Sequence, residues 1–420
     1  MNLSRSLKTS PVRWLALPVL AVALFYLTTG MRSLEVGYGG YAVYGATRAL
    51  AITTGTLAAL SAWEAGRLRA GQVWRRTSAR GRITVAFGAL RPVLLLTAVV
   101  DVTALSLAAV HAGAVPHFAD LPMILALGVV QIAFLVVGFG VGCVVPRALA
   151  APLVLIAVTL WLVLPPTLET PWVRYLTGVP TDAPTLTDTW DPAVLLAPPL
   201  LAAGAALAVV ALAVAGRSRL LRVGIAATVL VGAAVPAQAL VADAGYEAPT
   251  VPRTSAQTCS GEAPRICVPG ELSGSLPTLR AAAEQTLPAL AQAGIETPTS
   301  IENASVDAEL GERAWRIHLD PPVTRQRAIN AIATALIPRA PECTDLPDGF
   351  GVPSSGPLRI WLLRAAGVSE ERAARSGSAQ ARQTAAEVRT TSREDQLRWV
   401  RGQMELLSSC DPEVLTEAAR

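Results

Sequence analysis

Long runs of apolar residues alternate with short polar segments over the first 241 residues of the chain. A helix that crosses a bilayer needs about 20 mostly apolar residues, at a rise of about 1.5 Å each. Runs of this length predict seven membrane-spanning helices, over residues 14–30, 40–62, 84–111, 121–145, 149–166, 193–215 and 221–241. The first run follows basic residues as a secretory signal would. It has no small-x-small cleavage site and six further runs follow it, so we interpret it as a retained helix.

The pattern changes after residue 241. Residues 242–258 contain two prolines and predict a linker, and residues 259–420 are more polar. Apolar residues then recur at helical spacing in four stretches, and one stretch alternates like a strand. The helical stretches are 275–294, 324–337, 358–366 and 392–409, and the strand is 315–319. Pro288 should kink or shorten the first of these helices. We predict an α-helical polytopic membrane bundle followed by a small, mostly helical α+β domain.

Basic residues gather on alternate connections of the predicted bundle. Lysine and arginine collect on cytoplasmic loops, so this pattern predicts the orientation of the helices. With a cytoplasmic N-terminus, the exterior loops carry only Arg32 and Arg174. The interior segments then carry Arg5, Lys8, Arg13, Arg67, Arg69, Arg75, Arg76, Arg80, Arg82, Arg147, Arg217, Arg219 and Arg222. Seven crossings would place the C-terminal domain outside the cytoplasm, in a multi-pass protein of the plasma membrane.

The composition agrees with a membrane protein and argues against nucleic-acid binding. Hydrophobic residues make up 52% of the 420 positions, and the excess lies in the first 240 residues. The formal net charge is +4, but the basic residues lie at the ends of the spans, and the polar part has no basic stripe interleaved with aromatic residues. We therefore expect the lipid bilayer, and no nucleic acid, among the partners.

Four of the five cysteines, Cys259, Cys267, Cys343 and Cys410, lie in the predicted exterior domain. An even number in an oxidising compartment favours disulfides over free thiols or a zinc site, and the spacing fits no usual zinc pattern. Three pairings are open. We prefer Cys259 with Cys267 and Cys343 with Cys410, because the first two bracket a short turn. Cys143, alone in the fourth span, should pack as a small apolar side chain.

Charged side chains inside the predicted spans are the first candidates for function, because burying them in a bilayer costs several kcal/mol unless they are paired or hydrated. Arg91 is close enough to the cytoplasmic end to reach the interface. Arg48 and Asp101 lie about 12 and 15 Å below the outer surface, on consecutive helices. We hypothesise that they form an ion pair facing the bundle interior. A structural clamp and a substrate or proton pathway are both open. In the fourth span, Gly138, Gly140 and Gly142 indicate close helix packing.

Motifs for catalysis or metal binding are missing from the sequence. The histidines are His111, His117 and His318, and none belongs to a metal-binding or protease motif. No nucleophile elbow and no Walker A sequence occurs. We therefore expect no metal, no cofactor and no enzyme activity. Transport would need a separate ATPase or an ion gradient.

The segment between the second and third spans is strongly basic. Two interpretations fit it: a loop that binds water and lipid headgroups, or a docking surface for a cytoplasmic partner. The candidate docking residues are Glu64, Arg67, Arg69, Trp74, Arg75, Arg76, Arg80 and Arg82.

Two stretches resemble a known family. Residues 61–71 (SAWEAGRLRAG), with Trp74 and the basic segment after it, and residues 259–271 (CSGEAPRICVPGE) look like actinobacterial ABC-2-type permeases and their companion proteins. The resemblance implies a membrane subunit that works with a separately encoded cytoplasmic ATPase and contacts it through the basic loop. Seven spans and a large exterior domain depart from the simplest permease. It therefore stays open whether the chain forms the translocation path, pairs with a permease or forms a homodimer.

The sequence-based hypothesis is thus a membrane subunit or companion of an ABC-type exporter, whose exterior domain receives, gates or recognises cargo. The alternative is a non-transporting, membrane-anchored sensor or interaction protein that uses its extracytoplasmic domain to bind a ligand or a protein.

Overall fold

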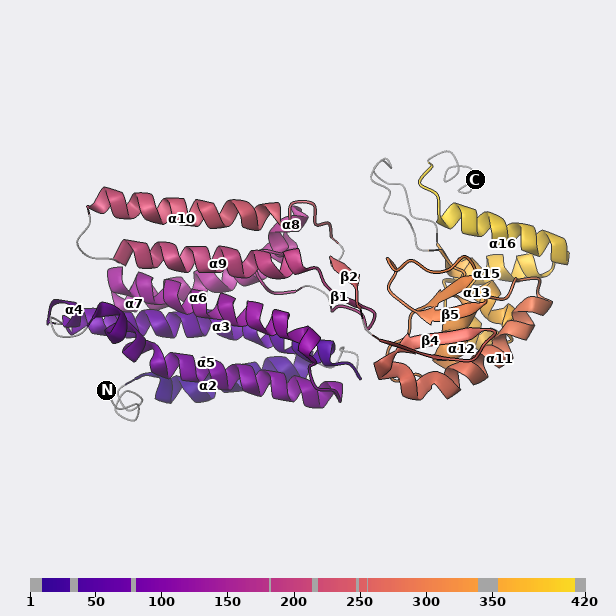
Figure 1. Ribbon diagram of the computed structural model, residues 1–420, viewed down its shortest axis with the longest axis horizontal. Helices are drawn as coiled ribbons and strands as arrows, with labels where there is room; N and C mark the ends of the chain where they lie inside the picture. Colours follow the sequence, from indigo (N-terminus) through magenta and orange to yellow (C-terminus); the bar gives the residue numbers. More distant parts are fainter. Residues whose placement is uncertain are drawn as a thin grey trace. The chain divides into compact units, whose positions relative to one another are not determined.

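The computed structural model describes residues 10–30, 37–76, 81–180, 183–213, 218–246, 249–254, 256–338 and 354–411. The chain divides into two compact units, Met1–Val251 and Pro252–Arg420. The first is helical and the second combines helices with a sheet (Figure 1).

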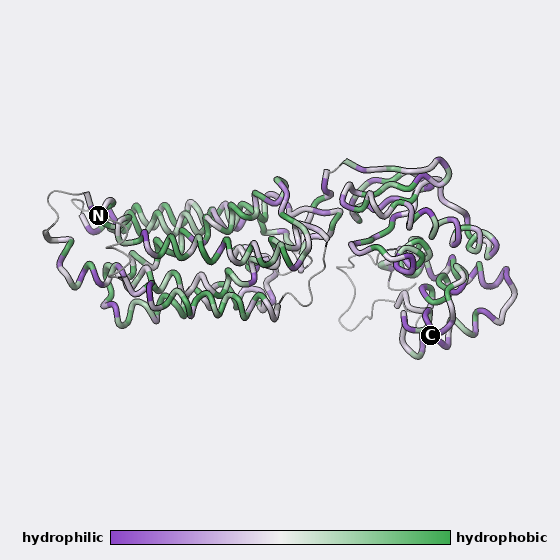
Figure 2. The backbone as a smooth tube through the Cα atoms, turned by 90° about the horizontal axis from the view of Figure 1, so that it is seen from below, coloured by the Kyte–Doolittle hydropathy of each residue, from purple (hydrophilic) through white to green (hydrophobic). Residues whose placement is uncertain are grey.

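The first unit is a bundle of long helices that lie side by side (Figure 1). They are α2 (Val12–Gly30), α3 (Gly39–Ala70), α5 (Arg82–Ala112), α6 (Leu121–Val144), α7 (Arg147–Val163), α9 (Pro192–Ala213) and α10 (Arg219–Ala239). Six helices in the described part of the chain are long and apolar enough to cross a membrane, and α3 is the long helix that is not among them. Figure 2 shows the hydrophobic residues that run along the bundle. The predicted polytopic bundle is confirmed.

Helix α3 covers the predicted second span and differs from its neighbours. It packs against α2, α5, α6 and α7, and most of its residues are buried. Those neighbours shield it from lipid, so it can be built from Gly, Ala, Thr and Ser instead of large apolar side chains. Its hydroxyls bond within the helix: Thr53 Oγ1 donates to Ala49 O at 3.1 Å, and Thr47 Oγ1 donates to Tyr44 O at 2.7 Å. Low hydropathy here reflects a central position.

Contacts at the helix ends show that the helices around α3 run in alternating directions. Gly37 N, just before α3, donates to Ala112 O at the end of α5 at 2.6 Å. At the other end of α3, Gly66 packs against Arg147, the first residue of α7. We call this second end, where α3 ends and α7 begins, the basic end.

The α3–α6 contact depends on two glycines. A Cβ atom at Gly138 would lie 2.3 Å from Ala58 O, and one at Gly142 would lie 2.1 Å from Ala62 O. Ser61 Oγ donates to Leu135 O at 2.7 Å across the same contact. Gly140 points elsewhere, toward Val209 of α9. The close packing predicted from these glycines is therefore present on two faces of α6.

At the end of the bundle opposite the basic end, the loop after α7 holds the segment that follows α10. The loop contains α8 (Pro171–Arg174) and β1 (Asp188–Trp190), and η2 (Phe118–Asp120) precedes α6. Tyr175 Oη donates to Gly245 O at 2.9 Å, and the Arg174 guanidinium lies 4.9 Å from the centre of the Tyr246 ring. Strand β2 (Thr250–Pro252) pairs with β1.

The second unit contains a four-stranded sheet in the order β3-β4-β5-β6. The strands are β3 (Gln257–Ser260), β4 (Arg265–Pro269), β5 (Ser300–Asn303) and β6 (Ala314–Ile317). β3 and β4 form an antiparallel hairpin, whereas β4, β5 and β6 are parallel. Parallel neighbours need a crossover connection, and α11 (Leu276–Gln292) provides it between β4 and β5.

Further helices complete the second unit, which confirms the predicted α+β class. They are α12 (Arg325–Ala333), α13 (Gly356–Ala365), α14 (Glu370–Ala374), α15 (Ala379–Arg389) and α16 (Arg393–Leu407). Thr324 and Ser392 accept N–H groups from the first turns of α12 and α16, as N-caps do. Helix α11 continues past Pro288 to Gln292, so the proline does not end it.

Candidate functional site

The basic end contains a buried carboxylate. Glu64 is fully buried near the end of α3. Ser10, which precedes α2, donates its hydroxyl to Glu64 Oε1, and Arg67 Nη2 lies 2.7 Å from Glu64 Oε2. A buried carboxylate is costly unless it is paired, and these two partners stabilise it. Glu64 therefore joins the start of α2 to the end of α3.

Two more arginines at this end hold helix termini together. Arg69 Nη1 donates to Val144 O, the last carbonyl of α6, as a basic side chain can at a helix C-terminus. The Arg147 guanidinium lies 5.3 Å from the centre of the Trp63 ring. The first part of the predicted docking segment is therefore the end of a helix packed against its neighbours.

Beyond α3, the segment forms a short helix, α4 (Val73–Arg76), that leads toward α5. Trp74 packs edge-to-face on Phe139 of α6, with ring centroids 6.4 Å apart. This contact fastens α4 to the bundle. Arg75 and Arg76 complete α4, Arg82 begins α5 and is exposed, and Arg80 lies outside the described residues.

A polar cluster lies inside the bundle, where α3, α5 and α6 meet. Gln131, which is 4% exposed, donates from Nε2 to Asp101 Oδ1 at 3.1 Å and to Thr54 Oγ1 at 3.5 Å. The Thr54 hydroxyl already donates to Leu50 O, so its oxygen can only accept from Gln131. That restriction orients the amide with its NH₂ group toward Asp101.

The predicted Arg48–Asp101 ion pair is not formed in the described part of the chain. The Arg48 guanidinium lies 5.1 Å from the centre of the Tyr44 ring, one turn earlier on α3, and Asp101 bonds to Gln131. Side chains on a helix tilt toward its N-terminus. Because α3 and α5 are antiparallel, this tilt carries the two charged groups toward opposite ends of the bundle.

Residues that sequence reasoning missed are uncharged. Gln131, Thr54 and Ser10 each bond to a carboxylate or to its partner, but they carry no charge that would mark them in an apolar stretch of sequence. A signal was present for Gln131, because it is the polar amide within the apolar run 121–145. Neutral polar side chains bond across helices in membranes and mark such contacts.

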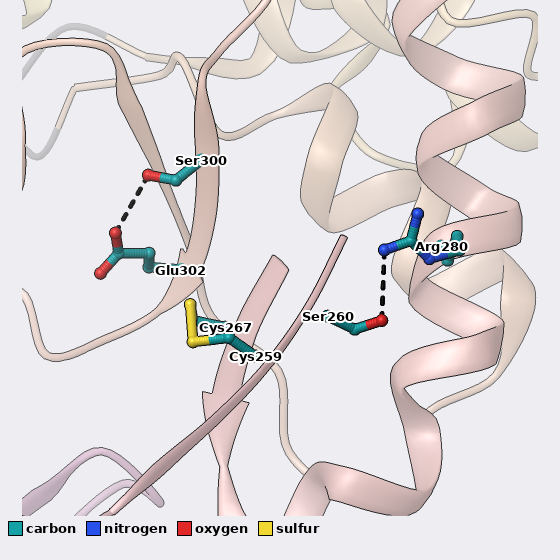
Figure 3. Close-up of a disulfide and its surroundings, with 6 residues drawn as sticks. All are labelled: Cys259, Ser260, Cys267, Arg280, Ser300 and Glu302. Atoms are coloured by element: carbon teal, nitrogen blue, oxygen red, sulfur yellow. Dashed lines mark hydrogen bonds between the residues drawn. A yellow bond between two sulfur atoms is a disulfide. The ribbon is translucent and has the colours of Figure 1, made fainter. Parts of the chain in front are cut away.

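The disulfide Cys259–Cys267 joins β3 to β4 at positions that are direct partners in the hairpin (Figure 3). This pairing agrees with the prediction. Cys410 is also disulfide-bonded, whereas Cys343, its predicted partner, lies outside the described residues. Cys143 is free, as expected for a thiol within a span.

No metal-binding group of His, Cys, Asp and Glu occurs among the described residues. The His117 main chain donates to Asp120 Oδ2 at 2.7 Å; His117 precedes the turn η2, and Asp120 is its last residue. Asn303, in a triplet that matches a glycosylation acceptor, is 1% exposed and bonds to both main-chain groups of Leu319.

Comparison with known proteins identifies part of the second unit. Residues 266–410 match a family model described as a domain of unknown function, DUF7224. This range begins inside β4 and ends just after α16. No curated protein matches the chain. No solved structure matches it either. The chain is thus a multispan membrane protein with a DUF7224 domain in its C-terminal region.

Proposed function

We propose that the chain is the integral membrane subunit, or a companion, of an ABC-type exporter that works with a separate cytoplasmic ATPase. The observation that carries this proposal is α4, a short helix fastened by Trp74 to the basic end, between the second and third long helices. The resemblance to ABC-2-type permeases implies an ATPase contact at this position. A helix fixed to the bundle can transmit a movement of a bound partner to the membrane helices, whereas a free loop cannot.

The distribution of charge supports a cytoplasmic basic end. Arg67, Arg69, Arg82 and Arg147 all belong to helix termini at that end, and basic residues are retained on the cytoplasmic side of membranes. The chain leaves the last bundle helix from the opposite end, so its C-terminal region would lie outside the cytoplasm. The Cys259–Cys267 disulfide supports this orientation, because disulfides persist in oxidising compartments.

The polar cluster supports a role beyond scaffolding. A carboxylate in a membrane helix costs at least about 2.5 kcal/mol and usually marks a pathway for a substrate or an ion. Asp101 has a single described partner, the Gln131 amide, and no described basic side chain forms an ion pair with it. In an exporter these groups would line the route through the bundle.

The test is purification of the tagged full chain from membranes of its host, with mass spectrometry of the proteins that accompany it. We expect a stoichiometric P-loop ATPase that is lost when Arg75→Glu and Arg76→Glu are combined. The matched control is Arg219→Glu, which reverses an exposed charge at the start of α10. Recovery without any ATPase, or equal loss with the control, would reject the docking role of α4.

The second candidate is a membrane-anchored sensor that does not transport. It is favoured by an open groove in the second unit, beside α11. A sensor would tolerate the reversal of Arg75 and Arg76, and would lose its response when Cys259→Ser removes the hairpin disulfide. An exporter subunit would lose its bound ATPase when Arg75 and Arg76 are reversed, whether or not the hairpin disulfide is present.

A further inference from the structure

The second unit has a groove of about 440 Å³ between α11 and the turn of the β3–β4 hairpin. Ligand pockets in proteins have volumes of about 300–1,000 Å³, so a small molecule fits. Pro264, Ile266, Leu287 and Pro298 give the groove apolar walls. Two charged residues, Arg280 and Glu284, also line it, one turn apart on α11.

Arg280 is held in place by its surroundings. Its Nη2 atom donates to Ser260 Oγ at 3.2 Å (Figure 3). The guanidinium lies over Gly261, where a Cβ atom would be 1.9 Å from Nη2 and where φ is +86°. The left-handed backbone favours glycine at this position, and a side chain there would displace the guanidinium. No described acidic side chain forms an ion pair with Arg280. Most of its donors are therefore available to a ligand.

Glu284 supplies the opposite charge. It follows Arg280 by four residues, a spacing that allows ion pairs on a helix. The structure shows no such pair between these two described residues. Arginine N-terminal to glutamate is the weaker order for this spacing, and the guanidinium is turned toward the hairpin. The groove thus presents a separated cation and anion beside an apolar surface.

We propose that this groove binds a small zwitterion with an apolar side chain, the chemistry of an aliphatic α-amino acid. Arg280 takes the carboxylate, because a guanidinium offers paired donors to its two oxygens. Glu284 takes the ammonium group, and Ile266 and Leu287 contact the aliphatic side chain. A ligand with either charge alone leaves one of the two groove charges unpaired.

The experiment compares three probes that share an aliphatic body: leucine, isocaproate, which lacks the ammonium group, and isopentylamine, which lacks the carboxylate. Binding to the full chain in lipid nanodiscs is measured by saturation-transfer NMR. We expect leucine to bind most tightly. Arg280→Gln should lower the affinity for leucine and for isocaproate about tenfold or more, the loss expected for a charge-assisted hydrogen bond. Glu284→Gln should lower the affinity for leucine and for isopentylamine, and should leave the affinity for isocaproate unchanged.

Two further variants keep the result interpretable. Arg401→Gln removes an exposed arginine whose Nε donates to Leu397 O of its own helix, and should leave leucine binding unchanged. Thr297→Trp adds bulk at an exposed position on the rim and should block all three probes. The proposal is overturned if leucine binds no better than the singly charged probes, or if its binding survives Arg280→Gln and Glu284→Gln. It is also overturned if Arg401→Gln has the same effect as Arg280→Gln.

Discussion

Replacing Gly142 by alanine should loosen the contact between α3 and α6. The new Cβ would lie 2.1 Å from Ala62 O and 2.8 Å from Ala62 C. Both are main-chain atoms, so no rotamer change can relieve the overlap. A carbon–oxygen contact needs about 3.3 Å, so the two helices must move apart by about 1 Å. Overpacking of this kind costs about 1–3 kcal/mol.

Gly128→Ala is the matched control, because Gly128 lies on the same helix and a Cβ there would meet no atom within 4 Å. Both variants gain the same helix propensity from the change of glycine to alanine, so the difference in stability between them measures the effect of packing. We expect the thermal midpoint of the full chain in mild detergent to fall by about 2–12 °C for Gly142→Ala relative to Gly128→Ala, using the scaling for a domain of about 150–250 residues, which is close to the size of the helical unit Met1–Val251. Equal midpoints in correctly assembled protein would refute the reasoning that Gly142 sets the approach of α3 to α6.

Three other substitutions test the remaining contacts. Gln131→Leu should destabilise the bundle by about 0.6–1.7 kcal/mol, because it removes the amide that donates to Asp101. Asp101→Asn can still accept that hydrogen bond and should be tolerated. Thermal unfolding of the two variants compares their stabilities. Replacing Cys259 and Cys267 by serine should cost the second unit about 2.5 kcal/mol, since the disulfide closes a loop with a sequence separation of 8 residues. Without reductant, proteolysis of the variant should be faster than that of the parent chain, and equal rates would contradict the prediction. A reductant effect that persists in the variant belongs to the disulfide of Cys410. Asn303→Ala should cost at least about 2 kcal/mol, because both main-chain groups of Leu319 lose their partner; faster hydrogen exchange in β5 and β6 would show it, and unchanged exchange would contradict it.

Hydropathy and periodicity predicted the long elements well, because those signals are averages over many residues. The runs at 84–111, 121–145 and 193–215 coincide closely with α5, α6 and α9, and the alternation at 315–319 marks β6. The same averages miss what makes α3 different. Its buried Thr and Ser residues lower its hydropathy, and only the arrangement of four neighbouring helices explains why they are tolerated.

The site residues were harder to predict, because depth along a helix does not give the direction of a side chain. Counting residues placed Arg48 and Asp101 at similar depth, but their side chains tilt toward opposite ends of the bundle. The groove beside α11 is a second case. Gly261 and Arg280 are separated by 19 positions, and nothing in the local pattern of either residue shows that they meet. Contacts of this kind depend on the fold.

The position of α3 has implications for how the chain is made. A ribosome delivers α3 before α5, α6 and α7, the helices that enclose it together with α2. The hydroxyls of α3 bond to carbonyls of the same helix, so few of its polar groups lack a hydrogen-bond partner when it enters the bilayer. Most of the helices that later pack against it have not yet been synthesised at that point. The insertion of α3 is therefore only marginally stable until the later helices pack against it. Changes at the α3–α6 contact would then act during synthesis, by lowering the fraction of chains that complete assembly, in addition to weakening the finished protein.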